Sequence, residues 1–237
     1  MQTPRRQFML SGLAATLARP VLAEPPTALI AVATNFLRVA EILRARFEAE
    51  SGFRLTLSGG ATGQLYGQII NGAPYDGFLA ADQARPARLE AAGLSLSRQT
   101  YARGLLALVA AQGTASQARL HTDFSHLAIA NPALAPYGLA AKQALTAMGL
   151  WAALRPRMVM GQNVGQAYAL VASGNADLGL VAQSYAGARA WSVPEDLYAP
   201  ILQDAVLLTK NAAAAAFIAY ITTTAQAEIR AAGYGAL

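Results

Sequence analysis

The stretch ALIAVATNFLRVAEILRARFE, residues 28–48, changes its hydrophobic pattern after Ala33. Residues 28–33 form a continuous apolar run, which is typical of a strand buried on both faces. From Phe36 to Phe47 the apolar residues recur at helical spacing, and charged residues fill the opposite face. A buried strand that leads directly into an amphipathic helix is the repeating unit of an α/β fold.

The same alternation of strand and helix continues along the rest of the chain. Further strands are expected at 53–57, 77–80, 101–110, 126–130, 158–160, 178–182 and 198–208. Further helices are expected at 64–70, 86–92, 137–148 and 164–172, and from 211 to the end. We therefore expect an α/β fold with mainly parallel sheets flanked by helices on both faces.

The length and composition favour two lobes. The chain has 237 residues, of which 54% are hydrophobic and 13% are charged, so disorder is excluded and two cores can be filled. The long strand run near Arg103 is the expected boundary, with a return crossing near Gln203. We expect a first lobe of residues 24–103 plus 203–237 and a second lobe of residues 104–202.

The composition also excludes several classes of protein. Cysteine is absent, so disulfides, thiol nucleophiles and thiolate-bound metals are excluded. The formal net charge is +5, but the sequence has no block of like charges, so we expect no nucleic-acid partner. No P-loop, G-x-S-x-G or H-E-x-x-H motif is present. We therefore expect neither catalysis nor a cofactor.

The first 23 residues are predicted to be an export signal that is later removed. Arg5 and Arg6 precede an apolar segment, residues 9–17, which is too short to span a bilayer. A small-residue cleavage pattern, Val21-Leu22-Ala23, follows it. The pattern resembles a twin-arginine signal, which exports folded proteins; an amphipathic helix of the mature domain is the alternative. We expect the mature protein to be soluble outside the cytoplasm.

Four predicted junctions between a strand and the following helix share one chemistry. They are Ala33-Thr34-Asn35-Phe36, Ser58-Gly59-Gly60-Ala61-Thr62-Gly63, Ala135-Pro136-Tyr137-Gly138 and Gln162-Asn163-Val164-Gly165. The free N–H groups of a helix's first turn and the positive end of its dipole favour anions. Ordinary N-capping explains any one junction more simply. The four together indicate an anion site.

The composition of these junctions narrows the class of anion. None of them contains Arg, Lys, Asp or Glu, so only dipoles and neutral donors would neutralise the ligand. A protonated phosphate needs an acceptor for its proton, and an amino acid needs a charge partner at each terminus. Sugars favour stacking aromatics. The pattern therefore predicts a fully deprotonated tetrahedral oxyanion.

At these residues the chain resembles a known family, the periplasmic molybdate-binding proteins of ABC importers, which also bind tungstate and have a type II periplasmic binding protein fold. The matching pieces are AVATNF (31–36), SGGATGQLYGQI (58–69), NGAPYDGFLAAD (71–82), IANP (129–132), APYG (135–138) and GNADLGLVA (174–182). The resemblance implies two α/β lobes that close on the anion like a hinged clamp. It also implies a periplasmic location and delivery to an inner-membrane ABC permease, and we expect a monomer.

The resemblance also implies a set of ligand-binding residues. Thr34 and Asn35 donate from the first junction, Thr62 from the second, and Tyr137 and Val164 through backbone N–H groups from the second lobe. Many family members have a tyrosine donor where this chain has Ala182. Either Tyr137 or Asn35 is the expected substitute for that donor. The metal of molybdate or tungstate would thus be held only as an oxyanion, through these five residues.

Two alternatives to molybdate or tungstate capture are kept open. A sulfate-type oxyanion receptor is the alternative among binding proteins, because sulfate is also a tetrahedral dianion. An exported hydrolase of phosphate or sulfate esters is the alternative among enzymes, and it requires a nucleophile or metal that the motifs do not supply.

Overall fold

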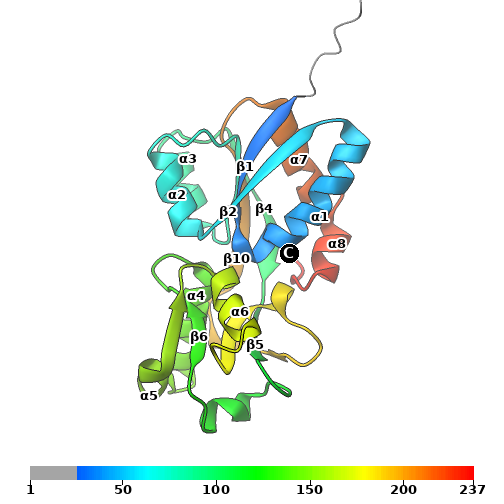
Figure 1. The fold of residues 1–237 in the computed structure, drawn as a ribbon. Helices are drawn as coiled ribbons and strands as arrows, with labels where there is room; N and C mark the ends of the chain where they lie inside the picture. Colours follow the sequence, from blue (N-terminus) through cyan, green and yellow to red (C-terminus); the bar gives the residue numbers. More distant parts are fainter. Residues whose placement is uncertain (1–25) are drawn as a thin grey trace, which may run out of the picture.

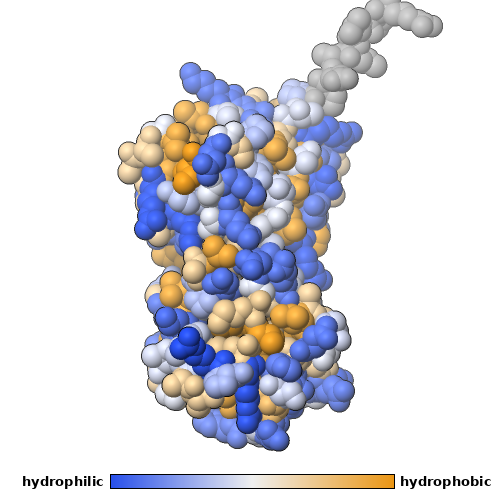
Figure 2. Space-filling view, turned by 60° about the vertical axis from the view of Figure 1, so that its left-hand side comes forward, coloured by the Kyte–Doolittle hydropathy of each residue, from blue (hydrophilic) through white to orange (hydrophobic). Residues whose placement is uncertain are grey.

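The computed structural model describes residues 26–237, so the predicted export signal at 1–23 lies outside the described residues. The chain forms two lobes, each built on a five-stranded sheet with helices packed on it (Figure 1). In the space-filling view the lobes are an upper and a lower mass that meet at a narrower waist (Figure 2). The predicted two-lobed α/β fold is confirmed.

The described residues contain ten strands and eight α-helices. The strands are β1 Thr27–Ala33, β2 Arg54–Gly60, β3 Gly77–Leu79, β4 Ser97–Gly104, β5 Leu106–Ala110, β6 Leu127–Ala130, β7 Met158–Gly161, β8 Leu178–Ala182, β9 Trp191–Ser192 and β10 Ile201–Leu207. The helices are α1 Thr34–Ser51, α2 Thr62–Ile70, α3 Ala84–Ala91, α4 Pro136–Ala147, α5 Trp151–Leu154, α6 Val164–Ala172, α7 Ala212–Thr222 and α8 Gln226–Ala231. Short 3-10 turns are η1 Gln117–His121, η2 Arg155–Arg157, η3 Gln183–Tyr185 and η4 Glu195–Leu197.

Each sheet is mixed, whereas the sequence predicted mainly parallel sheets. The first sheet has the order β2-β1-β3-β10-β4, and the second has the order β7-β6-β8-β5-β9. Strand β1 pairs in parallel with β2 on one side and β3 on the other, but β10 pairs antiparallel with β3 and β4. The second sheet repeats this, because β5 pairs antiparallel with β8 and β9. The antiparallel strands β4, β5 and β10 are the ones next to the crossings between lobes.

Two predicted elements are each divided in the structure. The expected strand 101–110 is two strands, β4 and β5, which separate at Leu105 and join different sheets. The expected C-terminal helix is divided into α7 and α8, which separate at residues 223–225. Threonine hydroxyls at the end of α7 bond back to its carbonyls. Thr222 Oγ1 donates to Ile218 O at 2.8 Å, and Thr223 Oγ1 donates to Ala219 O at 2.7 Å.

Strand β1 is buried on both faces, as its apolar run predicts. Ile30 and Val32 point into the core that α1 and α7 cover, whereas Ala31 points into the core under α2 and α3. The second lobe has its own core, to which Leu108 and Ile129 belong. None of the helices in residues 26–237 combines the length and the apolar character that a membrane crossing requires.

The topology places four helix starts at facing edges of the two sheets. Strands β1 and β2 of the first sheet lead into α1 and α2, while β6 and β7 of the second lead into α4 and α6. Because neighbouring parallel strands end at the same edge, the helices that follow them begin close together. The starts of α1, α4 and α6 lie in the middle of the molecule, where the lobes meet (Figure 1).

Candidate functional site

The five residues predicted from the sequence line one small cavity between the lobes. They are Thr34, Asn35 and Thr62 of the first lobe, and Tyr137 and Val164 of the second. The other residues that line this cavity are Ala33, Gly60, Ala61, Ala81, Ala135, Pro136 and Asn163. The structure thus brings all five together from four separate junctions. Their role in binding remains a prediction.

The cavity is surrounded by the first turns of α1, α2, α4 and α6. In these helices Thr34, Thr62 and Val164 are the first helical residues, and Tyr137 is the second, after Pro136. The N–H groups of a first turn have no acceptor within the helix, and the dipole adds partial positive charge there. Four such ends around one cavity provide a positive potential without a charged side chain.

Three of these four helices start without a side-chain cap. The residues before α1, α2 and α4 are Ala33, Ala61 and Ala135, and none of them makes a capping side-chain hydrogen bond. Only the fourth, α6, has the usual arrangement, in which Asn163 Oδ1 accepts from Gln166 N at 3.0 Å. An alanine in place of a capping residue costs about 0.5–2 kcal/mol of stability. Ordinary N-capping therefore explains one junction, and the other three leave amides available to a ligand.

Thr62 places a buried hydroxyl at the cavity wall. Its side chain is 1% exposed, and Oγ1 accepts from Ala81 N at 3.2 Å, which leaves the hydroxyl proton to donate elsewhere. The next amide, Gly63 N, is already bonded across the lobes to Leu134 O at 2.9 Å. The start of α2 therefore offers the hydroxyl and the N–H group of Thr62.

The side chains of Asn35 and Tyr137 take part in a buried network centred on Gln203. Asn35 Nδ2 donates to Gln203 Oε1 at 2.8 Å and to Tyr234 Oη at 3.1 Å. Gln203 Nε2 donates to Tyr137 Oη at 3.2 Å, and Tyr101 Oη donates to Gln203 Oε1 at 3.0 Å. The network links the start of α1 to the start of α4 through a single strand, β10.

This network decides which groups these two residues offer to a ligand. The Tyr137 hydroxyl lies at the crossing between lobes, where a Cβ added to Gly104 would come within 2.3 Å of it. The Asn35 amide is occupied by its two acceptors. The geometry therefore disfavours both side chains as replacements for the tyrosine donor that many family members have at the position of Ala182. It favours the backbone N–H groups of Asn35 and Tyr137 instead.

Burial keeps the network tyrosines protonated. Burial, as the largest cause, raises the pKa of Tyr101, Tyr137 and Tyr234 above its ordinary value near 10. A protonated phenol can both donate and accept, so each hydroxyl keeps its place in the network at neutral pH.

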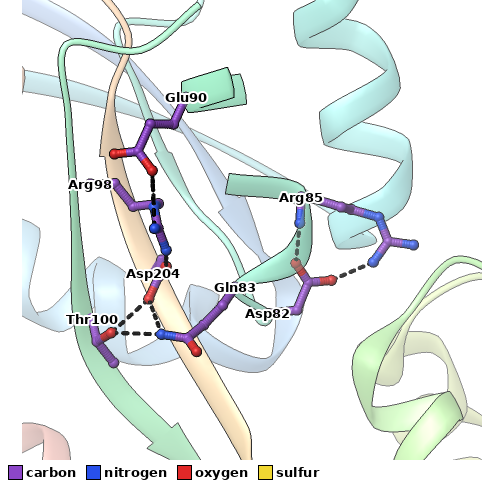
Figure 3. A network of polar contacts seen from close by, with 7 residues as sticks. All are labelled: Asp82, Gln83, Arg85, Glu90, Arg98, Thr100 and Asp204. Carbon is purple, nitrogen blue, oxygen red and sulfur yellow. Dashed lines mark hydrogen bonds and ion pairs between the residues drawn. The ribbon is translucent and has the colours of Figure 1, made fainter. Parts of the chain in front are cut away.

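Charged side chains of the first lobe pair with one another around Asp204 and Asp82 (Figure 3). Asp204, which is buried, accepts from Arg98 Nη1 at 2.7 Å and from Thr100 Oγ1 at 2.8 Å. The bond with Asp204 raises the pKa of Arg98. Asp82 forms an ion pair with Arg85, and it accepts from Arg85 N at 3.0 Å at the start of α3. None of these side chains lines the small cavity, so an anion there would meet only neutral donors.

The fold and this site agree with a family assignment. A family model described as "Bacterial extracellular solute-binding protein" matches residues 28–235, which is nearly the whole described chain. The chain belongs to this family. The match includes both lobes of the solute-binding protein and all four helix starts around the cavity.

Relatives of this solute-binding protein include proteins named for one anion. It is 42% identical to the molybdate-binding protein ModA of Azotobacter vinelandii, over 96% of this chain and 98% of the relative. It is 40% identical to ModA of Rhodobacter capsulatus, over 96% of this chain and 94% of that protein. The solved structure of the Azotobacter vinelandii periplasmic molybdate-binding protein superposes with a TM-score of 0.84, at 39% identity, over 89% of this chain and 99% of that one.

The sequence did not identify the residues of the solute-binding protein that hold the start of α1 in place through hydrogen bonds. Gln203 and Tyr234 hold Asn35, and Ser184 and Tyr185 contact the same turn of α1 from the other lobe. None belongs to the four junctions from which the sequence predicted the site. The one available signal was the pair Gln203-Asp204 inside an apolar strand, because polar residues buried in a strand require partners.

Proposed function

We propose that this solute-binding protein captures molybdate, or the similar anion tungstate, between its two lobes and delivers it to an ABC permease of the inner membrane. One observation carries the proposal: four helix starts from both lobes, three of them uncapped, surround one small cavity without charged side chains. The names of the relatives supply the anion. Binding proteins, not enzymes, make up the family matched.

We infer that the ligand is held by Thr34, Asn35, Thr62, Tyr137 and Val164. The donors would be the backbone N–H groups of these residues and the Thr62 hydroxyl. A rigid ring of donors suits one anion size, because a smaller anion leaves some donors unpaired. Each unpaired buried donor costs about 1–3 kcal/mol.

Calorimetric titration of the purified protein with molybdate, tungstate, sulfate and phosphate tests the proposal. Molybdate and tungstate should bind alike. If sulfate leaves two donors unpaired, it should bind about 30-fold to 20,000-fold more weakly. Sulfate binding as tight as that of molybdate would instead support the sulfate-type receptor. An ester hydrolase would turn over a phosphate or sulfate ester, and no turnover is expected.

We propose the lobe boundaries given above, residues 24–103 plus 203–237 and residues 104–202. Sheet membership supports them to within two residues, because β4 ends at Gly104 in the first sheet and β5 begins at Leu106 in the second. The chain returns to the first sheet with β10, which begins at Ile201. We also propose that the protein acts as a monomer.

We propose that residues 1–23 direct export through the twin-arginine route to the periplasm. Changing both Arg5 and Arg6 to Lys should stop the protein from reaching the periplasm, as followed by fractionation and immunoblotting. If the double variant is exported at the normal rate, the general secretory route is supported instead.

A further inference from the structure

Two hydroxyls of the second lobe are bonded to the first turn of α1 in the first lobe. Ser184 Oγ donates to Asn35 O at 2.8 Å, and Tyr185 Oη donates to Thr34 O at 2.5 Å. Both donors lie in η3, directly after β8 of the second sheet. The two bonds therefore exist only while the lobes are closed on each other.

The Tyr185 ring is held in place from both lobes. It stacks on Tyr168 of α6 with ring centroids 5.0 Å apart and an angle of 24° between the planes. From the other lobe, the guanidinium of Arg38 lies 5.8 Å from the ring centroid, a cation–π contact. Burial raises the pKa of Tyr185, so its hydroxyl keeps the proton that it donates.

The start of α6 leaves room for this contact. A Cβ added to Gly165 would lie 3.1 Å from Tyr185 Oη and 3.5 Å from Thr34 Cβ. Glycine at this position therefore lets the starts of α1 and α6 approach each other with the tyrosine hydroxyl between them. These are two of the four helix starts that surround the cavity.

The acceptors belong to peptide groups next to the proposed anion donors. Thr34 O shares its peptide group with the N–H of Asn35, and Asn35 O shares its peptide group with the N–H of Phe36. A hydrogen bond to a carbonyl polarises the peptide group, which strengthens its N–H as a donor. The two hydroxyls thus act on the anion through α1 without touching it.

We propose that Ser184 and Tyr185 are positioning residues that form a latch between the lobes, so that they set the affinity and the release rate of the anion but not the choice between anions. The proposal rests on the function proposed above. Bonds that form only in the closed state favour closure by their own free energy, whichever anion is present. Loss of these two hydrogen bonds should weaken the binding of every anion by the same factor and should speed the release of the anion.

The test compares hydroxyl deletions with matched controls in the full-length mature protein. Tyr185→Phe removes the bond to Thr34 O and keeps the ring on Tyr168. Ser184→Ala removes the bond from Ser184 to Asn35 O, which still accepts from Tyr234 Oη of the first lobe at 2.7 Å. Calorimetry should show that each variant binds molybdate and tungstate about 2- to 12-fold more weakly, which is the range for the loss of an ordinary hydrogen bond. The dissociation rate, measured by chasing bound molybdate with excess tungstate, should rise by a similar factor.

Two control variants separate the latch from a general effect on packing. Tyr168→Phe changes the stacking partner, whose hydroxyl makes no hydrogen bond within residues 26–237, and should bind molybdate as the wild type does. Ser184→Thr keeps a hydroxyl and should retain more affinity than Ser184→Ala. If Tyr185→Phe and Ser184→Ala both keep the wild-type affinity and release rate, the latch proposal is wrong. It is also wrong if either variant binds molybdate more weakly but binds tungstate as the wild type does. Failure of the wild type itself to bind molybdate overturns the proposed function.

Discussion

At the scale of single residues, the hydrogen bonds of the buried polar side chains determine which of these groups can still donate to a ligand. Among residues 26–237, the buried polar or charged side chains are Asn35, Thr62, Gln203 and Asp204. A polar group is stable in a core only when it is hydrogen-bonded, and each of these four has a partner. Thr62 differs from the others because its hydroxyl proton has no acceptor among the described residues. That proton is therefore the clearest side-chain donor for a ligand.

Thr62→Val should weaken molybdate binding while keeping the shape of the side chain. The loss should be about 1.5–3 kcal/mol, the range for a hydrogen bond to a charged group, and calorimetry measures it directly. The control is Thr114→Val, since Thr114 is exposed and does not line the cavity. If both variants bind molybdate as the wild type does, the Thr62 hydroxyl is not a ligand donor.

At the scale of elements, the starts of the helices must keep their positions if their N–H groups are to line the cavity. In α4 the third residue, Gly138, packs against the end of β6, where an added Cβ would come within 2.2 Å of Ala130 O. Ala130 O is a backbone atom in the middle of the second lobe and has little freedom to move. A side chain at position 138 would therefore push the α4 start, with the N–H of Tyr137, out of the cavity wall.

Gly138→Ala should weaken molybdate binding at least tenfold. It should also lower the free energy of unfolding by about 1–3 kcal/mol, the usual cost of overpacking. Calorimetry and urea denaturation measure the two effects. The matched control is Gly67→Ala in α2, where an added Cβ meets nothing within 4 Å. This control should leave affinity unchanged and raise stability by about 0.5–1 kcal/mol, because alanine favours the helix. Normal binding by Gly138→Ala would show that the α4 start is not part of the site.

Most elements and all four helix starts were predictable from the sequence, because each depends on local periodicity and on the strand that precedes it. The apolar run 28–33 and the helical spacing after it correspond to β1 and α1. The division of 101–110 into β4 and β5 was not predictable, since no proline interrupts this stretch and only tertiary pairing separates the two strands at Leu105. Nor was the contact of Ser184 with Asn35, because residues 149 positions apart meet only through closure of the lobes.

At the scale of the whole molecule, the buried tyrosines of the Gln203 network link stability to alkaline pH. Their pKa is raised in the folded state, so the folded protein binds these protons more tightly than the unfolded chain does. Stability is therefore complete below the unfolded pKa of about 10 and falls as pH rises above it. The slope should approach about 1.4 kcal/mol per pH unit for each of the tyrosines Tyr101, Tyr137 and Tyr234.

Urea denaturation between pH 8 and about pH 11.5 checks this prediction. The free energy of unfolding should be level up to about pH 10 and should then decline. Tyr234→Phe should make the decline shallower, since one titrating group is removed. A level profile throughout the range would contradict the assignment of these tyrosines as buried and protonated.

Closure is the second property of the whole molecule that can be measured. An anion that contacts both lobes favours the closed state by its differential affinity, so it should shift the population toward that state. Small-angle X-ray scattering should give a smaller radius of gyration after molybdate is added. An unchanged curve at saturating molybdate would mean that binding does not depend on movement of the lobes.

The most direct test of the account is a crystal structure with molybdate, in which anomalous scattering locates the molybdenum atom. The account predicts one molybdenum position in the small cavity, with anion oxygens within hydrogen-bonding distance of Thr34, Asn35 and Thr62 on one side and Tyr137 and Val164 on the other. A molybdenum atom in the larger groove beside Arg85 and Arg88, or one that contacts a single lobe, would contradict it.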